Sequence, residues 1–161
     1  MQWIERLIEQ NFIDPQQEEI VIQAGSCTWT PKGTQYHQVL PEQEFRSLLQ
    51  RARLVIAHCG EGTLDLLANV EKPFVLVPRS QKFGEHVDDH QVELANRLAQ
   101  QNIPIAYSPG DLVRFLQAPR TIKLALAPSA CYAYASGLLN SDLKELFKSP
   151  KRKIGLVSQV A

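Results

Sequence analysis

Two short, almost continuously apolar runs, residues 54–57 (LVIA) and 74–77 (FVLV), constrain the fold more than any other feature of this sequence. Each run is followed by a polar or glycine-containing loop and then by a segment with helical spacing of its apolar residues. Strands without polar alternation are buried on both faces, which is typical of parallel sheets with helical crossovers. The pattern predicts an α/β chain of Rossmann-like type, with a mostly parallel sheet and helices on both faces.

The rest of the chain continues this alternation as far as Pro119. An amphipathic helix is expected at residues 2–10, where Trp3 and Leu7 share one face. Further strands are predicted at 20–22, around Val39 and within 103–107, and further helices at 41–52, at 63–70, from Asp88 or Asp89 onward, and at 109–117. We therefore predict a domain of residues 1–118 and an extension of residues 119–161 that contacts a partner. The extension is expected to hold a short helix within 140–153 and a basic cluster, Lys148, Lys151, Arg152 and Lys153.

Composition excludes several classes of function. The chain has 161 residues, with 17 basic and 17 acidic side chains, so its net charge of +0 argues against a nucleic-acid partner. Its three cysteines, Cys27, Cys59 and Cys131, form no CxxC pair and are odd in number, which favours reduced thiols in a cytoplasmic protein. No apolar run approaches the roughly 20 residues that span a bilayer. Membrane association is therefore expected only through a partner or a surface patch.

The loop HCGEGT, residues 58–63, follows one of the two apolar strands and precedes a helix. Ligands of open parallel sheets bind at the carboxyl ends of strands, where a helix N-terminus presents unpaired N–H groups and a positive dipole end. Gly60 and Gly62 would let a diphosphate approach the backbone closely. Glycines in such a turn also serve close packing alone, and the side chain of Glu61 must point away from an anion. Both interpretations stay open from these residues.

A second polar loop precedes the helix expected near Asp88 or Asp89. A carboxylate at a helix N-terminus is favourable without any ligand, which explains one aspartate but not the neighbouring polar side chains. These are Glu85, His86, His90 and Gln91. One interpretation is a transition-metal site, since the two imidazoles are four residues apart. A loop that binds the hydroxyl groups of a sugar or nucleotide uses the same residue types and is favoured.

Four segments in this order resemble the C-terminal-type domain of family 28 glycosyltransferases: QAGSCTWTPKG, LVIAHCGEGTLDLL, KPFVLVPR and GEHVDDHQVELANRL. The resemblance covers about residues 2 to 117. It is strongest to the small soluble subunit of two-subunit enzymes of bacterial exopolysaccharide synthesis and of eukaryotic dolichol-linked glycan assembly. The resemblance implies half of a GT-B fold that binds a nucleotide-sugar donor, typically a UDP-sugar.

The resemblance also assigns donor-binding residues. Gly60, Gly62 and Thr63 match the loop that faces the donor diphosphate, with His58 at its edge. Further along the chain, Pro78 and Arg79 match the strand end near the nucleotide, and Glu85, Asp89, His90 and Gln91 belong to the element that faces the donor sugar.

The implied reaction is an inverting hexosyl transfer to a lipid-linked or polysaccharide acceptor, without a cofactor or bound metal. Backbone N–H groups and a helix dipole would stabilise the charge that develops on the leaving UDP. The resemblance places the general base and the acceptor in a membrane-associated partner subunit. The chain is then expected to be cytoplasmic and peripheral to the membrane through that partner.

Two departures from the family pattern bear on these expectations. Relatives begin with a strand and a glycine loop before the first helix, whereas this sequence begins almost at the helix; either the start is truncated, or that strand and loop are lost. A lost central strand would expose an unpaired sheet edge. In addition, Leu66, beside Asp65, stands where many relatives carry a glutamate suited to ribose hydroxyls. Ribose binding is then weakened or rerouted.

Two other functions remain as alternatives. The chain would be a non-catalytic nucleotide-sugar-binding or regulatory subunit if the absent loop is needed for turnover. A metal-dependent hydrolase would centre on His86, Asp89 and His90. A nucleophilic Cys59 is disfavoured, although a helix N-terminus lowers thiol pKa values, because no paired histidine and acid support it.

Overall fold

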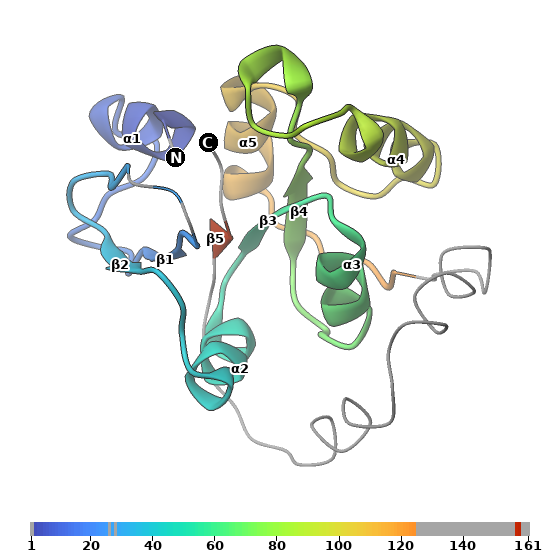
Figure 1. The fold of residues 1–161 in the computed structure, drawn as a ribbon. Helices are drawn as coiled ribbons and strands as arrows, with labels where there is room; N and C mark the ends of the chain where they lie inside the picture. The colour runs from blue at the N-terminus through green and yellow to red at the C-terminus, as the bar shows by residue number, and fades with distance from the viewer. Residues whose placement is uncertain (1, 26, 28, 125–156, 159–161) are drawn as a thin grey trace.

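The structure is a computed structural model that describes residues 2–25, 27, 29–124 and 157–158. Helices and strands alternate along the chain, as Figure 1 shows. In chain order the elements are α1 (Gln2–Glu9), β1 (Val21–Gln23), β2 (Gln35–His37), α2 (Glu42–Arg51), β3 (Val55–His58), α3 (Glu61–Ala68), β4 (Phe74–Val77), the 3-10 helix η1 (Gln81–Phe83), α4 (His90–Ala99), α5 (Pro109–Gln117) and β5 (Val157–Ser158).

The strands form one sheet in the order β2-β1-β5-β3-β4, and every described pair is parallel. This confirms the predicted α/β class and parallel sheet. Val157 of β5 lies opposite both Ile22 of β1 and Ile56 of β3. The gap that a lost central strand would leave is therefore filled by β5, which belongs to the segment 119–161. The predicted division at residue 118 stays a prediction, as does the helix within 140–153, which lies outside the described residues together with its basic cluster.

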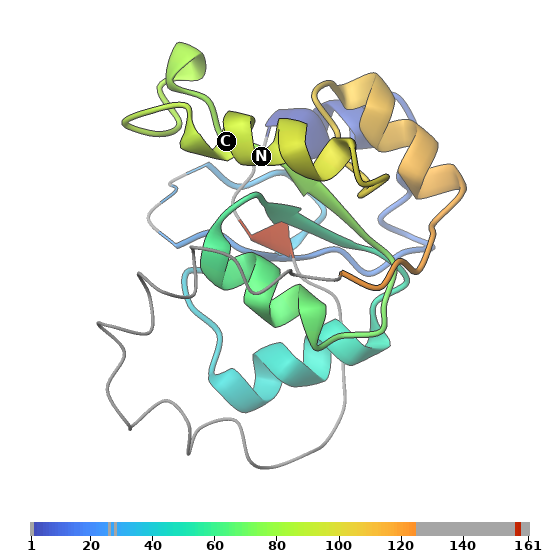
Figure 2. The same ribbon diagram turned by 90° about the vertical axis from the view of Figure 1, so that its right-hand side faces the viewer.

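Side chains along β3 and β4 alternate between two buried clusters, one on each face of the sheet. Val55 and Phe74 join a cluster with the buried leucines of α2 and α3 and with Leu98 of α4. Ile56 and Val75 join a second cluster with buried residues of α1 and α5. Figure 2 shows α2 and α3 on one side of the sheet and α1 and α5 on the other. Helices on both faces are thus confirmed, and they explain why the two strands lack polar positions.

Two strand predictions need correction. The strand expected around Val39 ends at His37, because Leu40 turns into the core and its N–H donates to Oε1 of Gln23 at 3.0 Å. Val39 is left 75% exposed. The strand expected within 103–107 is reduced to a single bridge between Leu76 and Ile105. Proline at 104 accounts for this, since it offers a carbonyl to Leu76 but no N–H to extend the ladder.

Some helices begin one or two residues away from their predicted starts. Pro41 is the N-cap of α2 and not its first residue, and α3 begins two residues before Thr63, at Glu61. Asp89 is the N-cap of α4, but its side chain caps no backbone N–H of that helix.

None of the helices in the described part of the chain is long and apolar enough to cross a membrane.

Candidate functional site

The two polar loops lie at the same edge of the sheet. His58, the last residue of β3, is opposite Val77, the last residue of β4. Because both strands are parallel, the chain leaves them side by side, toward α3 in one case and toward η1 and α4 in the other (Figure 1). The two loops singled out in the sequence, 58–63 and the polar loop before α4, therefore follow neighbouring strands at one carboxyl edge of the sheet.

The N-terminus of α3 has no side-chain cap. Its N-cap, Gly60, is extended and makes no side-chain hydrogen bond. Gly62 and Thr63 lie in the first turn and not in a preceding loop, and a Cβ atom added at Gly62 would meet nothing within 4 Å. The first N–H groups of a helix have no intrahelical partner, and their dipoles favour an anion at this position. Gly62 thus leaves open space over a natural anion site.

The imidazole of His58 lies directly against this helix N-terminus. Its Nε2 atom is 3.0 Å from Oγ1 of Thr63, whereas its Nδ1 atom is buried without a hydrogen-bond partner among the described residues. A Cβ atom at Gly60 would come within 2.4 Å of Cε1 of His58. Glycine is therefore required at position 60 by the packing of His58, which is a reason that the sequence alone did not reveal.

Burial lowers the pKa of His58 to about 4, and the nearby Arg79 guanidinium and His86 act in the same direction. The side chain of Gln91 opposes this shift only in part. The imidazole is consequently neutral at physiological pH. It acts at this edge as a neutral hydrogen-bonding group and not as a cation.

Arg79 supplies the positive charge that His58 does not. Its backbone N–H donates to Oε1 of Gln91 at 3.2 Å, which ties the end of β4 to the first turn of α4. Gln91 is 8% exposed, so this amide is almost fully enclosed. The guanidinium is half-buried, which lowers its pKa, while the nearby Glu85 carboxylate raises it in part. Within the described ranges Arg79 forms no close ion pair. Arg79 is thus a partly desolvated cation beside the uncapped N-terminus of α3.

The carboxylates of loop 80–89 are partly engaged within the loop. Oδ1 of Asp89 accepts from Oγ of Ser80 at 3.0 Å and from the N–H of Gln81 at 2.8 Å. Oε2 of Glu85 accepts from the N–H of Ser80 at 3.1 Å. Gly84, with φ of 69°, makes the left-handed turn that closes the loop. Sequence reasoning assigned Asp89 and Glu85 to a ligand and missed this internal role, which leaves each residue one oxygen for a ligand.

Both loop histidines bind Asp88. Nδ1 of His86 lies 2.9 Å from Oδ1 of Asp88, and Nδ1 of His90 lies 2.7 Å from Oδ2. These contacts lower the pKa of Asp88 and raise the pKa of His90, whose side chain is 79% exposed. A hydrolase site centred on His86, Asp89 and His90 is therefore wrong, because Asp89 faces Ser80 instead. Across the described residues, no three His, Cys, Asp or Glu side chains are placed to hold a metal ion.

Two further residues that the sequence analysis discussed are Cys59, just before α3, and Leu66, within it. Cys59 is fully buried, and burial raises its pKa to about 12 despite the helix N-terminus that follows it. Leu66 packs against the core cluster of α2 and α3, while the neighbouring Asp65 is exposed. The side chain of Leu66 thus offers no polar group at this position.

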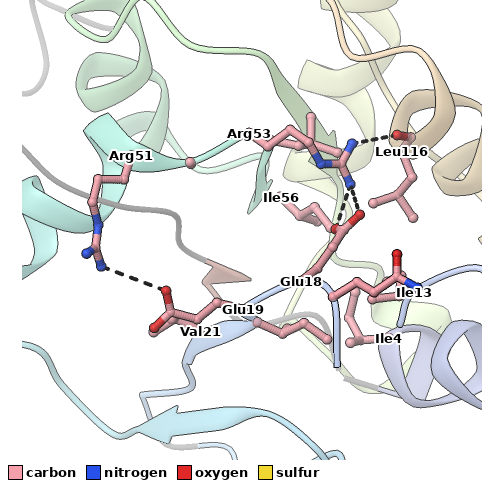
Figure 3. Close-up of a pocket in the computed structure, with 13 residues that line it drawn as sticks. Ile4, Ile13, Glu18, Glu19, Val21, Arg51, Arg53, Ile56 and Leu116 are labelled. Atoms are coloured by element: carbon pink, nitrogen blue, oxygen red, sulfur yellow. Dashed lines mark hydrogen bonds and ion pairs between the residues drawn. The ribbon is translucent and has the colours of Figure 1, made fainter. Parts of the chain in front are cut away.

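A pocket of about 450 Å³ lies at the opposite edge of the sheet, where β1 and β3 begin (Figure 3). Arg53 donates to both carboxylate oxygens of Glu18, at 2.8 and 2.7 Å, and to the carbonyl of Leu116 at 2.8 Å. Arg51 lies 3.9 Å from Glu19. Since these charges neutralise one another, this pocket does not share the unpaired cation and open helix end of the carboxyl edge.

Comparison with known proteins agrees with this geometry. Residues 3–134 match the glycosyltransferase family 28 C-terminal domain. The chain belongs to this family. The family 28 C-terminal domain is the Rossmann-like half of a GT-B fold, as the alternating helices and parallel strands show here. The resemblance inferred from four sequence segments is confirmed at this level.

Curated relatives of the family 28 domain are larger enzymes. The chain is 27% identical over 129 residues to the UDP-N-acetylglucosamine--N-acetylmuramyl-(pentapeptide) pyrophosphoryl-undecaprenol N-acetylglucosamine transferase of Trichodesmium erythraeum, covering 80% of this chain and 33% of that enzyme. It is 29% identical over 116 residues to the enzyme of the same description from Sorangium cellulosum, covering 65% of this chain and 28% of that enzyme. The chain thus spans about a third of the length of these relatives. No solved structure shows a significant match.

Proposed function

We propose that this chain binds the UDP-sugar donor of a glycosyltransferase and presents it for hexosyl transfer to a lipid-linked or polysaccharide acceptor. One observation carries the proposal: the open N-terminus of α3, the neutral His58–Thr63 pair and the unpaired Arg79 guanidinium converge at one edge of the sheet. Together they supply hydrogen-bond donors, a dipole and one cation for a diphosphate. Parallel α/β sheets bind ligands at this edge.

The diphosphate is assigned to the first turn of α3. Gly62 leaves the N–H groups of this turn accessible, and Oγ1 of Thr63 projects from the same turn. His58 fixes the position of that hydroxyl through its Nε2 atom. These preorganised groups would stabilise charge on the departing UDP without reorganising during the reaction.

The donor sugar is assigned to the first turn of α4 and the loop before it. The second oxygens of Asp89 and Glu85 are acceptors for sugar hydroxyls, and His90 is exposed beside them. Gln91 acts by holding the backbone of Arg79, and its amide lies close to His58. The loop therefore links the groups proposed for the sugar to those proposed for the diphosphate.

The acceptor and the general base are assigned to a membrane-associated partner subunit. The chain spans about a third of relatives whose names specify a pyrophosphoryl-undecaprenol acceptor, which supports an acceptor-binding half elsewhere. Direct displacement at the anomeric carbon would break its bond to the UDP oxygen as the acceptor oxygen bonds from the opposite face. The partner's base would take the acceptor proton, and transfer would invert the anomeric centre. The chain would then work on the cytoplasmic side, peripheral to the membrane.

Thermal unfolding with UDP and with uridine tests the donor site. At about 100 times Kd, UDP is expected to stabilise the fold by about 2.7 kcal/mol, which raises Tm by roughly 5 to 10 °C. Uridine lacks the diphosphate and should give a much smaller shift. Arg79→Met should reduce the UDP shift, whereas Arg51→Met, at the opposite edge, should leave it unchanged. Equal shifts in the two variants, or none in the wild type, would overturn the proposed site.

Transfer is tested separately with a radiolabelled UDP-hexose and the membranes of cells that carry the partner. Asp89→Asn keeps Oδ1 as an acceptor but removes the charge, so it should bind UDP and lose most transfer. If the wild-type chain binds UDP and supports no transfer with any membrane fraction, the alternative of a non-catalytic nucleotide-sugar-binding or regulatory subunit is favoured instead.

A further inference from the structure

Strand β5 lies between β1 and β3 in the middle of the sheet (Figure 1). Val157 of β5 is in register with Ile22 of β1 on one side and with Ile56 of β3 on the other. In the described sheet, β1 and β3 do not pair with each other. The two outer parts of the sheet, β2-β1 and β3-β4, are therefore joined by a strand that follows all the others in the sequence.

The residues on either side of β5 are buried. Ile22 of β1 and both Ile56 and Ala57 of β3 are at most 5% exposed. The N–H and C=O groups that β1 and β3 direct toward each other are thus shielded from water, and buried backbone groups without partners destabilise a fold. One strand between β1 and β3 pairs with both rows of groups at once. The space between these two strands, which we call the β1–β3 slot, therefore requires a parallel strand.

The β1–β3 slot also sets the distance between two loops at the carboxyl edge of the sheet. Gln23, the last residue of β1, is level with Ala57 of β3, because both are in register with Ser158. Neighbouring strands lie about 4.8 Å apart, so a strand in the slot holds β1 and β3 about 10 Å apart. If an empty slot closed, the loop after β1 would move about 5 Å closer to His58 at the end of β3.

The loop after β1 borders the proposed donor site. Its residue Cys27 packs against the core cluster that contains Val77, the last residue of β4. Cys27 also lies close enough to Arg79 to raise the pKa of that guanidinium in part. The surroundings of the proposed diphosphate site therefore come from both sides of β5, and their spacing depends on the strand in the slot.

We propose that the β1–β3 slot is a binding site for a parallel β-strand, that residues 157–158 of the same chain occupy it, and that this occupation assembles the donor site. The last step rests on the proposed donor function. The sequence around β5, RKIGLVSQVA at residues 152–161, contains the apolar residues that suit a strand buried on both faces. An extended peptide binds a sheet edge through main-chain hydrogen bonds, and the empty slot offers two such edges.

Val157→Pro in the 161-residue chain tests the slot, because proline offers no N–H group to a neighbouring strand. The substitution should lower Tm by roughly 5 to 10 °C and abolish most of the UDP-dependent rise in Tm. Val157→Ile keeps the N–H group and the branched Cβ, so it should preserve both properties. These two variants are compared by differential scanning fluorimetry with and without UDP.

A fluorescent peptide of sequence RKIGLVSQVA shows whether the slot binds a strand. Fluorescence anisotropy should give about tenfold tighter binding to the Val157→Pro protein than to the wild type, in which β5 fills the slot. The bound peptide should also restore the Tm and the UDP shift of the variant. The same peptide with Val157→Pro is the matched control and should do neither.

Peptide binding is measured without UDP, which separates this proposal from the donor function. Wild-type Tm and UDP shift in the Val157→Pro protein, or equal peptide binding by both proteins, would overturn the slot. If the peptide restores Tm and no protein shows a UDP shift, the donor function fails and the strand-binding site stands. If the wild type alone shows a UDP shift after the peptide has restored Tm, assembly of the donor site by β5 is refuted.

Two measurements on the wild-type chain add independent tests. Residues 157 and 158 should be as protected from amide hydrogen exchange as β3, and unprotected exchange would contradict the proposal even if Val157→Pro fails to fold. Size-exclusion chromatography tests the source of the strand. A wild-type dimer that Val157→Pro converts into a monomer would assign the strand to a second copy and overturn its assignment to the same chain.

Discussion

The Nε2 atom of His58 lies 3.0 Å from Oγ1 of Thr63, across the turn in which β3 ends and α3 begins. Gly60 sits between the two residues in the chain, and its missing side chain is what allows the imidazole to fold back over the turn. The contact therefore fixes a neutral ring and a hydroxyl at a helix N-terminus.

Replacing Thr63 with valine is expected to weaken UDP binding more than folding. The substitution keeps the shape of the side chain but leaves Nε2 of His58 without its partner, which costs about 1 kcal/mol of stability. It also removes a hydroxyl from the proposed diphosphate site. Thr34→Val is the matched control, since Oγ1 of Thr34 donates to the carbonyl of Pro31 at 2.8 Å in another loop. Differential scanning fluorimetry with UDP should show a smaller shift for Thr63→Val alone.

His58 should make the fold less stable as pH falls. In the unfolded chain its pKa is about 6.5, and in the folded protein it is about 4. The unfolded state therefore binds more protons below about pH 6.5, so the stability that the neutral ring provides above this pH is lost progressively toward pH 4. The loss should be about 1–2 kcal/mol after allowance for partial solvent exposure. Urea unfolding at pH 7.5 and 4.5 should show a shallower pH dependence in His58→Asn and an unchanged one in His37→Asn.

The two glycines of the 58–63 turn should respond oppositely to alanine. Gly62 is in a helical turn with open space around it, so Gly62→Ala should stabilise the fold by about 0.5–1 kcal/mol and raise Tm by roughly 1 to 4 °C. It should nevertheless weaken UDP binding, because the new methyl group covers the helix end. Gly60→Ala should lower Tm, since its Cβ meets the ring of His58. A Gly62→Ala protein that binds UDP as well as the wild type would show that nothing approaches this turn.

Cys27 and Cys59, the two cysteines in the described part of the chain, should differ sharply in reactivity. Cys27 is partly exposed, whereas Cys59 is buried with a pKa of about 12. A Cys131→Ser background leaves these two cysteines for titration with a chromogenic disulfide at pH 8. One thiol should react quickly, and Cys27→Ser should abolish this phase, whereas Cys59→Ser should not change it. Rapid modification of Cys59 in the folded protein would contradict its burial.

The sequence predicted strands β3 and β4 well and the rest of the sheet less well. The apolar runs of β3 and β4 have four residues each and are buried on both faces, so their composition leaves little choice of structure. The segment 35–40 is different, because a side-chain contact from Gln23 determines where β2 ends. The single bridge at Ile105 likewise depends on Pro104 and its placement against β4. Such long-range contacts are not encoded in local periodicity.

The candidate site was predictable as a location and only partly as a set of contacts. Strand order and loop position place His58 and Arg79 at one edge, which follows from parallel pairing. The fold of loop 80–89 does not follow from residue spacing. The Asp89 carboxylate could accept either from an N–H group of its own helix or from the N–H of Gln81, and it accepts from Gln81. Gly84 was the available signal, since a left-handed turn there reverses the chain toward Ser80.

Asp89 therefore has two proposed tasks, and they can be separated by two substitutions. Asp89→Ala removes the oxygen that accepts from Ser80 and Gln81, so the loop should open and lose protection from amide hydrogen exchange. Asp89→Asn keeps a carbonyl oxygen for both donors and should retain a closed loop. Because Asn lacks the charge and the second carboxylate oxygen, it should still impair transfer of the sugar. Glu93→Ala, on the exposed side of α4 with only a 3.9 Å contact to Arg97, is the control and should alter neither property. If Asp89→Asn transfers sugar at the wild-type rate while Asp89→Ala does not, the carboxylate serves only to close the loop, and direct contact of Asp89 with the donor is excluded.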